Sequence, residues 1–204
     1  MYKKYKIFLF NPYPSVGGAD TTLNRFINSI DFNRFDVEYL SLKKVKYNKN
    51  KKIVFTKLNS NSTFLGFFEI YKIVKKDKHK KKIFFSMQYF VNVWTIIFMK
   101  FFLNIKVFIY DINHLDELSY YTSFKDYFKK KIINNLVKLL YRHADIAAGN
   151  SKELAKAIEK HASCKTYTLY NPCFEKINKK KKYFSVRIIL IFSAYLGLKI
   201  KKII

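Results

Sequence analysis

The stretch with the clearest capacity for chemistry runs from Asn11 to Leu23 and reads N-P-Y-P-S-V-G-G-A-D-T-T-L. It joins an apolar run, typical of a strand, to apolar residues at helical spacing. Gly17 and Gly18 lack a Cβ, which permits positive φ and a close approach to the backbone. The amides of Gly18 and Ala19 then lie near a helix N-terminus, which attracts anions. The stretch predicts a phosphate-binding turn, although G-x-G-x-x-G and G-x-x-x-x-G-K-[ST] are absent and an ordinary tight turn is the alternative.

A second polar stretch follows a predicted buried strand at 106–110 and concentrates titratable groups. Its polar members are Asp111, Asn113, His114, Asp116 and Glu117. In open α/β sheets, ligands bind outside the carboxyl ends of the strands. We therefore expect one open cleft at that edge, lined by residues that each follow a predicted strand: Gly17, Gly18, His114 and Asn171.

Alternating strands and helices must position these loops. The predicted strands are 6–10, 35–40, 52–55, 82–86, 106–110, 144–149 and 166–170. The predicted helices are one that carries Leu23, Phe26, Ile27 and Ile30, then 64–74, 89–103, 123–142, and one capped by Asn150 or Ser151. This alternation predicts an α/β, Rossmann-like fold in one domain, with a doubly wound parallel sheet.

Two of these helices have one apolar side, and a third is strongly apolar. Helix 64–74 has Phe64, Phe67, Phe68, Tyr71 and Val74 on one side, and helix 123–142 has a stripe of Phe124, Phe128, Ile132, Leu136 and Leu139. Helix 89–103 is too short to span a bilayer and is interrupted by Lys100, so it is predicted to be buried or to lie on a membrane surface.

The composition indicates a globular chain with a cationic surface. The 204 residues are 50% hydrophobic and carry a formal net charge of +26. AT-rich codon bias accounts for much of this composition, yet such a surface is attracted to anionic membranes whatever its origin. The two cysteines, Cys164 and Cys173, indicate a reducing compartment, and no leader peptide is evident. We expect a cytoplasmic protein that binds peripherally to the inner face of a membrane.

Four landmarks resemble the N-terminal half of GT-B glycosyltransferases of glycosyltransferase family 4. Pro14 to Asp20 is similar to the family's P-x-x-G-G-A-E, with aspartate in place of glutamate. His114 lies in the loop after a mid-domain strand. The segment 144–154 looks like A-D-x-(x)n-S-x-x-L, and Tyr170-Asn171-Pro172 looks like the I-x-N-P/G turn that closes the domain. The resemblance covers residues 1 to 175.

The resemblance implies retaining transfer of a hexosyl group from a nucleotide sugar to a glycan or lipid-linked acceptor in bacterial surface polysaccharide, lipopolysaccharide or glycolipid synthesis. Gly17, Gly18, Ala19 and Asn171 would contact the donor phosphate or the acceptor. His114 would act near the reacting sugar, with a locally bonded loop histidine as the alternative. Possible acceptor contacts are Asp111, Asn113, Asp116 and Glu117, although solvated loop acids are the simpler interpretation. No metal and no cofactor are expected, since the nucleotide sugar is a substrate.

Residues 176–204 depart from that family. They contain a basic linker and an apolar segment, but not the Gly-Arg segment, the distal lysine or the paired glutamates that bind the donor in the second domain. We expect an abortive start of that domain, an apolar segment 188–198 that packs back on the sheet or promotes association, and no turnover by this chain alone. Two other classes stay open: a basic α/β module that binds nucleic acid or anionic surfaces without catalysis, and a Rossmann-type enzyme such as a nucleotide-sugar epimerase. No partner nucleic acid is expected, because the aromatic residues are not interleaved with basic ones.

Overall fold

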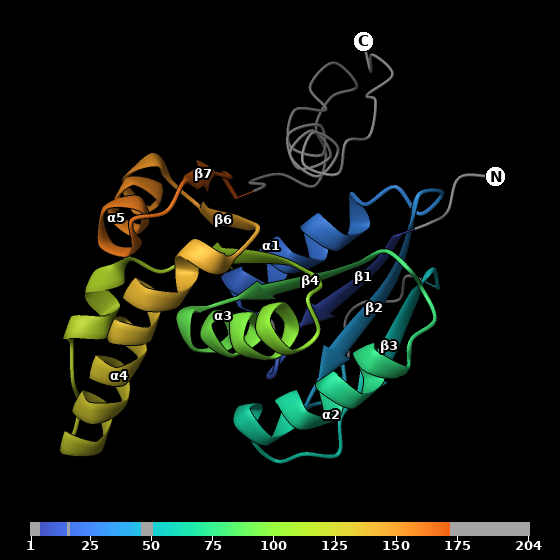
Figure 1. Ribbon diagram of the computed structural model, residues 1–204, viewed down its shortest axis with the longest axis horizontal. Coiled ribbons are helices and arrows are strands. Elements are labelled where there is room, and N and C mark those ends of the chain that lie inside the picture. Colours follow the sequence, from blue (N-terminus) through green and yellow to red (C-terminus); the bar gives the residue numbers. More distant parts are fainter. Residues whose placement is uncertain (1–4, 16, 46–50, 172–204) are drawn as a thin grey trace, which may run out of the picture.

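Seven strands form one sheet in the computed structural model, which describes residues 5–15, 17–45 and 51–171 (Figure 1). All neighbouring strands pair in parallel, in the order β3-β2-β1-β4-β5-β6-β7. The strands are β1 (Tyr5–Phe10), β2 (Phe35–Ser41), β3 (Ile53–Lys57), β4 (Lys82–Met87), β5 (Lys106–Asp111), β6 (Ile146–Gly149) and β7 (Thr166–Thr168). The predicted parallel α/β sheet is confirmed, and β7 is shorter than its predicted range.

Helices cover both faces of this sheet, because successive strand residues point to opposite sides. Phe8 and Phe10 face a layer of four helices, whereas Ile7 and Leu9 face α1 (Gly18–Asn28). The four helices are α2 (Thr63–Lys76), α3 (Tyr89–Thr95), α4 (Phe124–Leu140) and α5 (Lys152–Ala162). Three short helical segments complete the described chain: η1 (Ile96–Phe102), η2 (Leu115–Ser119) and η3 (Tyr141–His143). The fold is therefore doubly wound, as predicted.

The apolar helix predicted at 89–103 changes pitch along its length. It is α-helical through Thr95 and continues as a π-helix in η1. Lys100, which interrupts the apolar pattern, lies 2.7 Å from both carboxylate oxygens of Asp145. Asp145 also accepts a hydrogen bond from the backbone N–H of Val107 at 2.8 Å. The Ala144-Asp145 landmark therefore has a structural role, since it fastens η1 to the start of β5.

Most of the apolar stripe of α4 does not face the core, although Leu136 packs against it partly buried. Phe124, Phe128, Ile132 and Leu139 are 75%, 49%, 56% and 54% exposed. The buried residues of α4 are instead Ile133 and Val137. Phe64 and Phe68 of α2 are also exposed, although Phe67 and Val74 from the same predicted side are buried. Periodicity identifies an apolar face, but the neighbouring elements decide which face they cover.

Several predictions fall outside the described residues. These are the basic linker, the apolar segment 188–198, the closing Pro172, Cys173 and the division into domains at 175 and 176. They stay predictions. Within the described residues, no helix combines the length and the apolar character that crossing a bilayer requires.

Candidate functional site

The crevice expected in this fold lies at the carboxyl ends of β1 and β4, which are neighbours in the sheet. The chain builds outward from β1 on one side and from β4 on the other, so the connections reverse direction here. The glycine loop follows β1, Gln88 follows β4, and Asp111 is the last residue of β5. The topology thus brings both polar stretches identified from the sequence to the same edge.

The glycine loop enters α1 with ordinary backbone angles. Gly17 caps the helix with φ −75° and ψ 173°, and its carbonyl accepts from both the N–H and the hydroxyl of Thr21. The interpretation that these glycines supply positive φ is therefore not supported. A Cβ built on Gly18 would meet no atom within 4 Å. What the glycine provides at this position is open space beside the first turn of α1.

Asp20 holds the loop in place. Its Oδ1 accepts from Asn11 Nδ2 at 2.5 Å, and its Oδ2 accepts from Ser15 Oγ at 2.7 Å. The side chain lies in the first turn of α1, where the helix dipole favours negative charge. Asp20 consequently offsets much of the attraction that this helix end has for another anion.

A pocket of about 260 Å³ opens beside the loop. It is lined by Ala19, Gln88, Tyr89, Phe90, Asp111, Ile112, Asn113, Glu117, Leu118, Asp126, Lys129, Lys130 and Ile133. Four of the predicted site residues therefore meet in one cavity: Ala19, Asp111, Asn113 and Glu117. Gly17, Gly18, His114, Asp116 and Asn171 are not part of its lining, so the expected cleft with His114 and Asn171 stays a prediction.

Asp111 forms the buried floor of this pocket. It is 1% exposed, and its Oδ1 accepts from Asn92 Nδ2 at 2.9 Å. Asn92 also accepts from Ser86 Oγ and donates toward the hydroxyl of Tyr141. Burial raises the pKa of Asp111 to about 8, although its hydrogen bonding acts in the opposite direction. A carboxyl group that is largely protonated near neutral pH can donate a hydrogen bond.

The remaining polar residues of the second stretch are fixed locally. The hydroxyl of Tyr89 donates to the carbonyl of Asn113 at 2.6 Å, and burial raises the pKa of Tyr89, which keeps it a donor. Asn150 Nδ2 donates to the carbonyl of Ile112 at 2.8 Å. His114 caps η2 by accepting from the backbone N–H of Asp116 at Nδ1, and the same Nδ1 lies 3.0 Å from the exposed carboxylate of Asp116. The locally bonded alternative for His114 matches this geometry.

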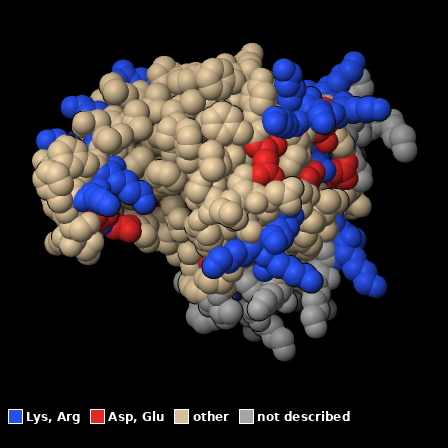
Figure 2. Space-filling model, turned by 90° about the horizontal axis from the view of Figure 1, so that it is seen from below, with Lys and Arg blue, Asp and Glu red and all other residues tan. Residues whose placement is uncertain are grey.

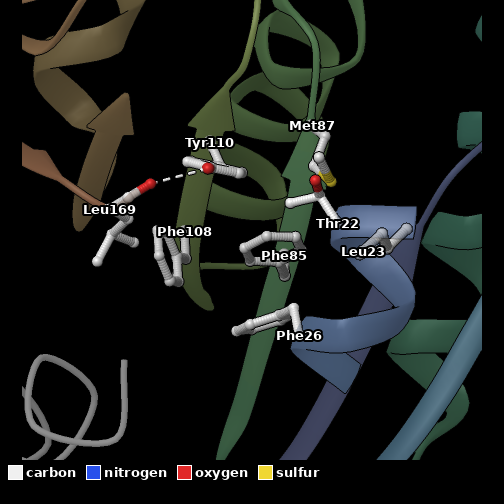
Figure 3. Close-up of a pocket in the computed structure, with 8 residues that line it drawn as sticks. All are labelled: Thr22, Leu23, Phe26, Phe85, Met87, Phe108, Tyr110 and Leu169. Atoms are coloured by element: carbon white, nitrogen blue, oxygen red, sulfur yellow. Dashed lines mark hydrogen bonds between the residues drawn. The ribbon is translucent and has the colours of Figure 1, made fainter. Parts of the chain in front are cut away.

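Asn171 lies beside the end of β5. The hydroxyl oxygen of Tyr110 lies 2.8 Å from the carbonyl oxygen of Leu169 (Figure 3) and 2.7 Å from Oδ1 of Asn171, so its single proton is donated to one of these two acceptors at a time. A small hollow nearby is lined by side chains from α1 and from β4, β5 and the Leu169 segment, including Phe26, Phe85 and Phe108. Its volume of about 10 Å³ suits at most a single water molecule. The hollow is a packing gap rather than a ligand site.

Sequence reasoning missed several residues of the pocket. Lys129 and Lys130 enter from α4, and Gln88 and Tyr89 enter from the turn after β4. Asn92 was also missed, and its only signal is a single amide within the apolar run Y-F-V-N-V-W. In the described part of the chain, no group of three or more His, Cys, Asp or Glu side chains could hold a metal ion.

Known proteins resemble this chain in structure but not detectably in sequence. No protein-family model matches the chain, and no curated protein matches it significantly. HepE of Anabaena, solved with UDP-glucose, superposes with a TM-score of 0.60 at 15% identity over 94% of this chain and 50% of its own. The lipopolysaccharide outer core galactosyltransferase WaaB, in its apo form, gives 0.54 at 15% identity over 87% of this chain and 50% of its own.

A plant protein shows the same relationship. UGT2 of Phytolacca americana, solved with UDP-2-fluoro-glucose and pterostilbene, gives a TM-score of 0.54 at 10% identity over 86% of this chain and 56% of its own. The chain therefore spans about half the length of the structures that it matches. At such low identity the similarity establishes the fold alone, and that fold is a GT-B N-terminal-like domain.

Proposed function

We propose that this chain is the acceptor-side half of a retaining glycosyltransferase, which transfers a hexosyl group from a nucleotide sugar to a glycan or lipid-linked acceptor in bacterial surface polysaccharide, lipopolysaccharide or glycolipid synthesis. One observation carries the proposal. In a GT-B-like fold, a pocket at the carboxyl ends of the strands joins Ala19 of the glycine loop to Asp111, Asn113 and Glu117. Carboxyl and amide groups of this kind bind sugar hydroxyls.

The pocket is proposed to hold the acceptor, and the loop amides to face the donor phosphate or the acceptor. A leaving nucleoside diphosphate gains negative charge, which fixed N–H donors at Gly17 and Gly18 would stabilise, provided that the N–H of Gly17 gives up its 3.3 Å hydrogen bond to Oγ of Ser15. Because Asp20 already lies in this helix turn, the loop alone binds a diphosphate weakly. Most donor affinity is therefore assigned to a second half of the enzyme. In this proposal His114 orients the reacting sugar or relays a proton, and Asn171 contacts the donor phosphate or the acceptor.

The site is proposed to work at the cytoplasmic face of a membrane. The net charge of +26 attracts the chain to anionic lipid, through the lysine-rich turns and the basic residues of the α4 region. Peripheral attachment would bring a lipid-linked acceptor within reach of the pocket.

Calorimetry with UDP- and GDP-sugars, together with a transfer assay on a lipid-linked acceptor, tests whether the acceptor is bound by this chain and the donor by a second half. We expect the purified chain to bind a nucleotide sugar no more tightly than about 1 mM, and to show no turnover, because transfer requires both substrates in a reactive pose. Micromolar donor affinity or measurable transfer by this chain would contradict the assignment of the donor to a second half.

Amide NMR spectra test the site itself. Adding a lipid-linked acceptor should shift the resonances of Ala19, Asn113 and Glu117. Gly18→Leu introduces a good helix former but fills the open space beside the loop. The acceptor affinity measured from these shifts should therefore decrease at least about tenfold. Val54→Gln, on the distant edge strand β3, is the matched control and should leave them unchanged. Shifts elsewhere on the molecule, or none at all, would refute the pocket as the acceptor site.

A further inference from the structure

The outward side of α4 carries an apolar surface with no cover in the described chain. We define the α4 ridge as Phe124, Phe128, Ile132 and Leu139, all of which are about half exposed or more. Phe124 and Phe128 contact each other edge to face, with ring centroids 4.7 Å apart. Two exposed tyrosines, Tyr120 and Tyr121, precede the ridge. The exposed Asn135 lies on the same side of the helix and separates Leu139 from the other three. Exposed apolar area of this kind marks a site of interaction with a partner or a membrane.

Lysines flank the ridge on both sides. Residues advance by about 100° around a helix, which places Lys131 and Lys138 along one side of the ridge and Lys125 along the other. Lys129 lies further round the helix, where it lines the pocket and sits 5.1 Å from the centre of the Phe90 ring. All four are exposed. The sequence of α4 contains five lysines and one acidic residue, Asp126. That aspartate is engaged by Lys130 at 3.2 Å, on the side of the helix that lines the pocket.

The same pattern extends beyond α4. Figure 2 views the molecule from the side toward which α4 and α2 lie in Figure 1, and it shows a broad area without charged side chains between two groups of lysine and arginine. Exposed aromatic residues also lie on two other helices that cover the same face of the sheet: Phe64 and Phe68 on α2, and Phe101 and Phe102 on η1. Phe101 contacts His143, which follows α4, with ring centroids 5.1 Å apart.

Charge selects the occupant of this surface. A second copy of the chain would bring two cationic surfaces together, each from a molecule of net charge +26. A nucleic acid would satisfy the lysines but would leave the phenylalanines in water. An anionic bilayer satisfies both, because its head groups pair with the lysines while its acyl boundary accepts the apolar side chains. Tyrosines favour the same boundary, since they have an apolar ring and a polar tip.

We propose that the α4 ridge inserts into the interface of an anionic lipid bilayer, with the flanking lysines at the head groups. This inference deepens the proposed peripheral role, in which attachment was assigned to charge alone. It also orients the pocket, because Lys130 and Ile133 line the pocket from the opposite side of the same helix. An amphiphilic acceptor with an anionic head group can then remain in the bilayer while its head reaches the site.

Flotation with vesicles of phosphatidylcholine, with and without phosphatidylglycerol, tests the ridge. A variant with Phe124→Gln, Phe128→Gln and Ile132→Gln retains helix formers and changes only exposed side chains, so it should fold normally by circular dichroism. We expect its partition onto anionic vesicles to fall at least about tenfold, while weak salt-sensitive binding remains. Val54→Gln is the control, since Val54 is 55% exposed and Ile132 is 56% exposed.

A fluorescent probe separates insertion from adsorption. The chain has one tryptophan, so Phe128→Trp in a Trp94→Phe background reports on the ridge alone. Its emission should shift to shorter wavelength on anionic vesicles. An unshifted emission, undiminished binding of the ridge variant, or a ridge variant that turns a dimer into a monomer would each overturn the proposal. These assays contain no sugar substrate, so their failure is distinct from a failure of the proposed transfer.

Discussion

The free energy of unfolding of this protein should decrease as the pH rises from acidic to alkaline values, and Asp111→Asn should remove most of that decrease. Burial raises the pKa of Asp111 from 3.8 to about 8. Between these values the folded chain holds a proton that the unfolded chain has released. Folding therefore takes up a proton, and the free energy of unfolding decreases as the pH rises from about 4 to about 8, then levels off. The full effect is on the order of 5 kcal/mol.

Urea unfolding at about pH 5 and about pH 9 measures this difference. The substituted asparagine keeps an oxygen that can accept from Asn92, so the variant and the parent should be close in stability at the lower pH. At the higher pH the variant should be more stable by several kcal/mol. Glu159→Gln removes an exposed carboxylate of α5 and controls for net charge. A variant with the same pH dependence as the parent would show that Asp111 is ionised in the folded protein.

Gly149→Ala should destabilise the fold, because α5 packs directly onto the end of β6. A Cβ built on Gly149 would lie 2.9 Å from the backbone nitrogen of Ala155 and 3.0 Å from Cγ of Leu154. Backbone atoms of a helix cannot move aside singly, so the whole of α5 must shift. Overpacking of this kind costs about 1–3 kcal/mol and occasionally more. The midpoint of urea unfolding should decrease accordingly.

The same exchange at Gly18 is the matched control. A Cβ there meets nothing within 4 Å, and alanine is the better helix former by about 1 kcal/mol. Gly18→Ala should therefore leave the unfolding midpoint unchanged or raise it. Equal stability of Gly149→Ala and the parent would mean that α5 is free to move away from β6, contrary to the contact described.

The strands were predictable because central strands of a parallel sheet are apolar on both faces. Every residue of β1 is buried, and a continuous apolar run of this kind predicts a strand without any knowledge of the elements that pack against it. The glycine loop and the stretch after β5 were equally predictable as ligand-binding positions, since the alternation of elements fixes which loops meet at the carboxyl edge.

The α4 ridge and the Asn92 network were not predictable in the same way. The stripe from Phe124 to Leu139 is longer and more aromatic than the pair Ile133 and Val137, yet the shorter pair faces the core. The positions of the elements packed against α4, which include α3 and α5, decide which side of the helix is buried. Asn92 likewise reads as an interruption of an apolar helix until Ser86, Asp111 and Tyr141 are placed around it.

The strand order has a consequence for how the chain folds during synthesis. After β3 the chain crosses β2 and β1 once to place β4, and from then on each new strand pairs with the strand made immediately before it. The sheet can therefore grow outward from β4 in the order of translation, and each addition closes a loop at most half as long as the one between β1 and β4, since Phe108 pairs with Ile146 and Lys6 with Lys82. The pairing of β1 with β4 brings Lys6 next to Lys82 and closes the longest loop of the sheet. A nascent chain cannot form this pair until β4 has been synthesised.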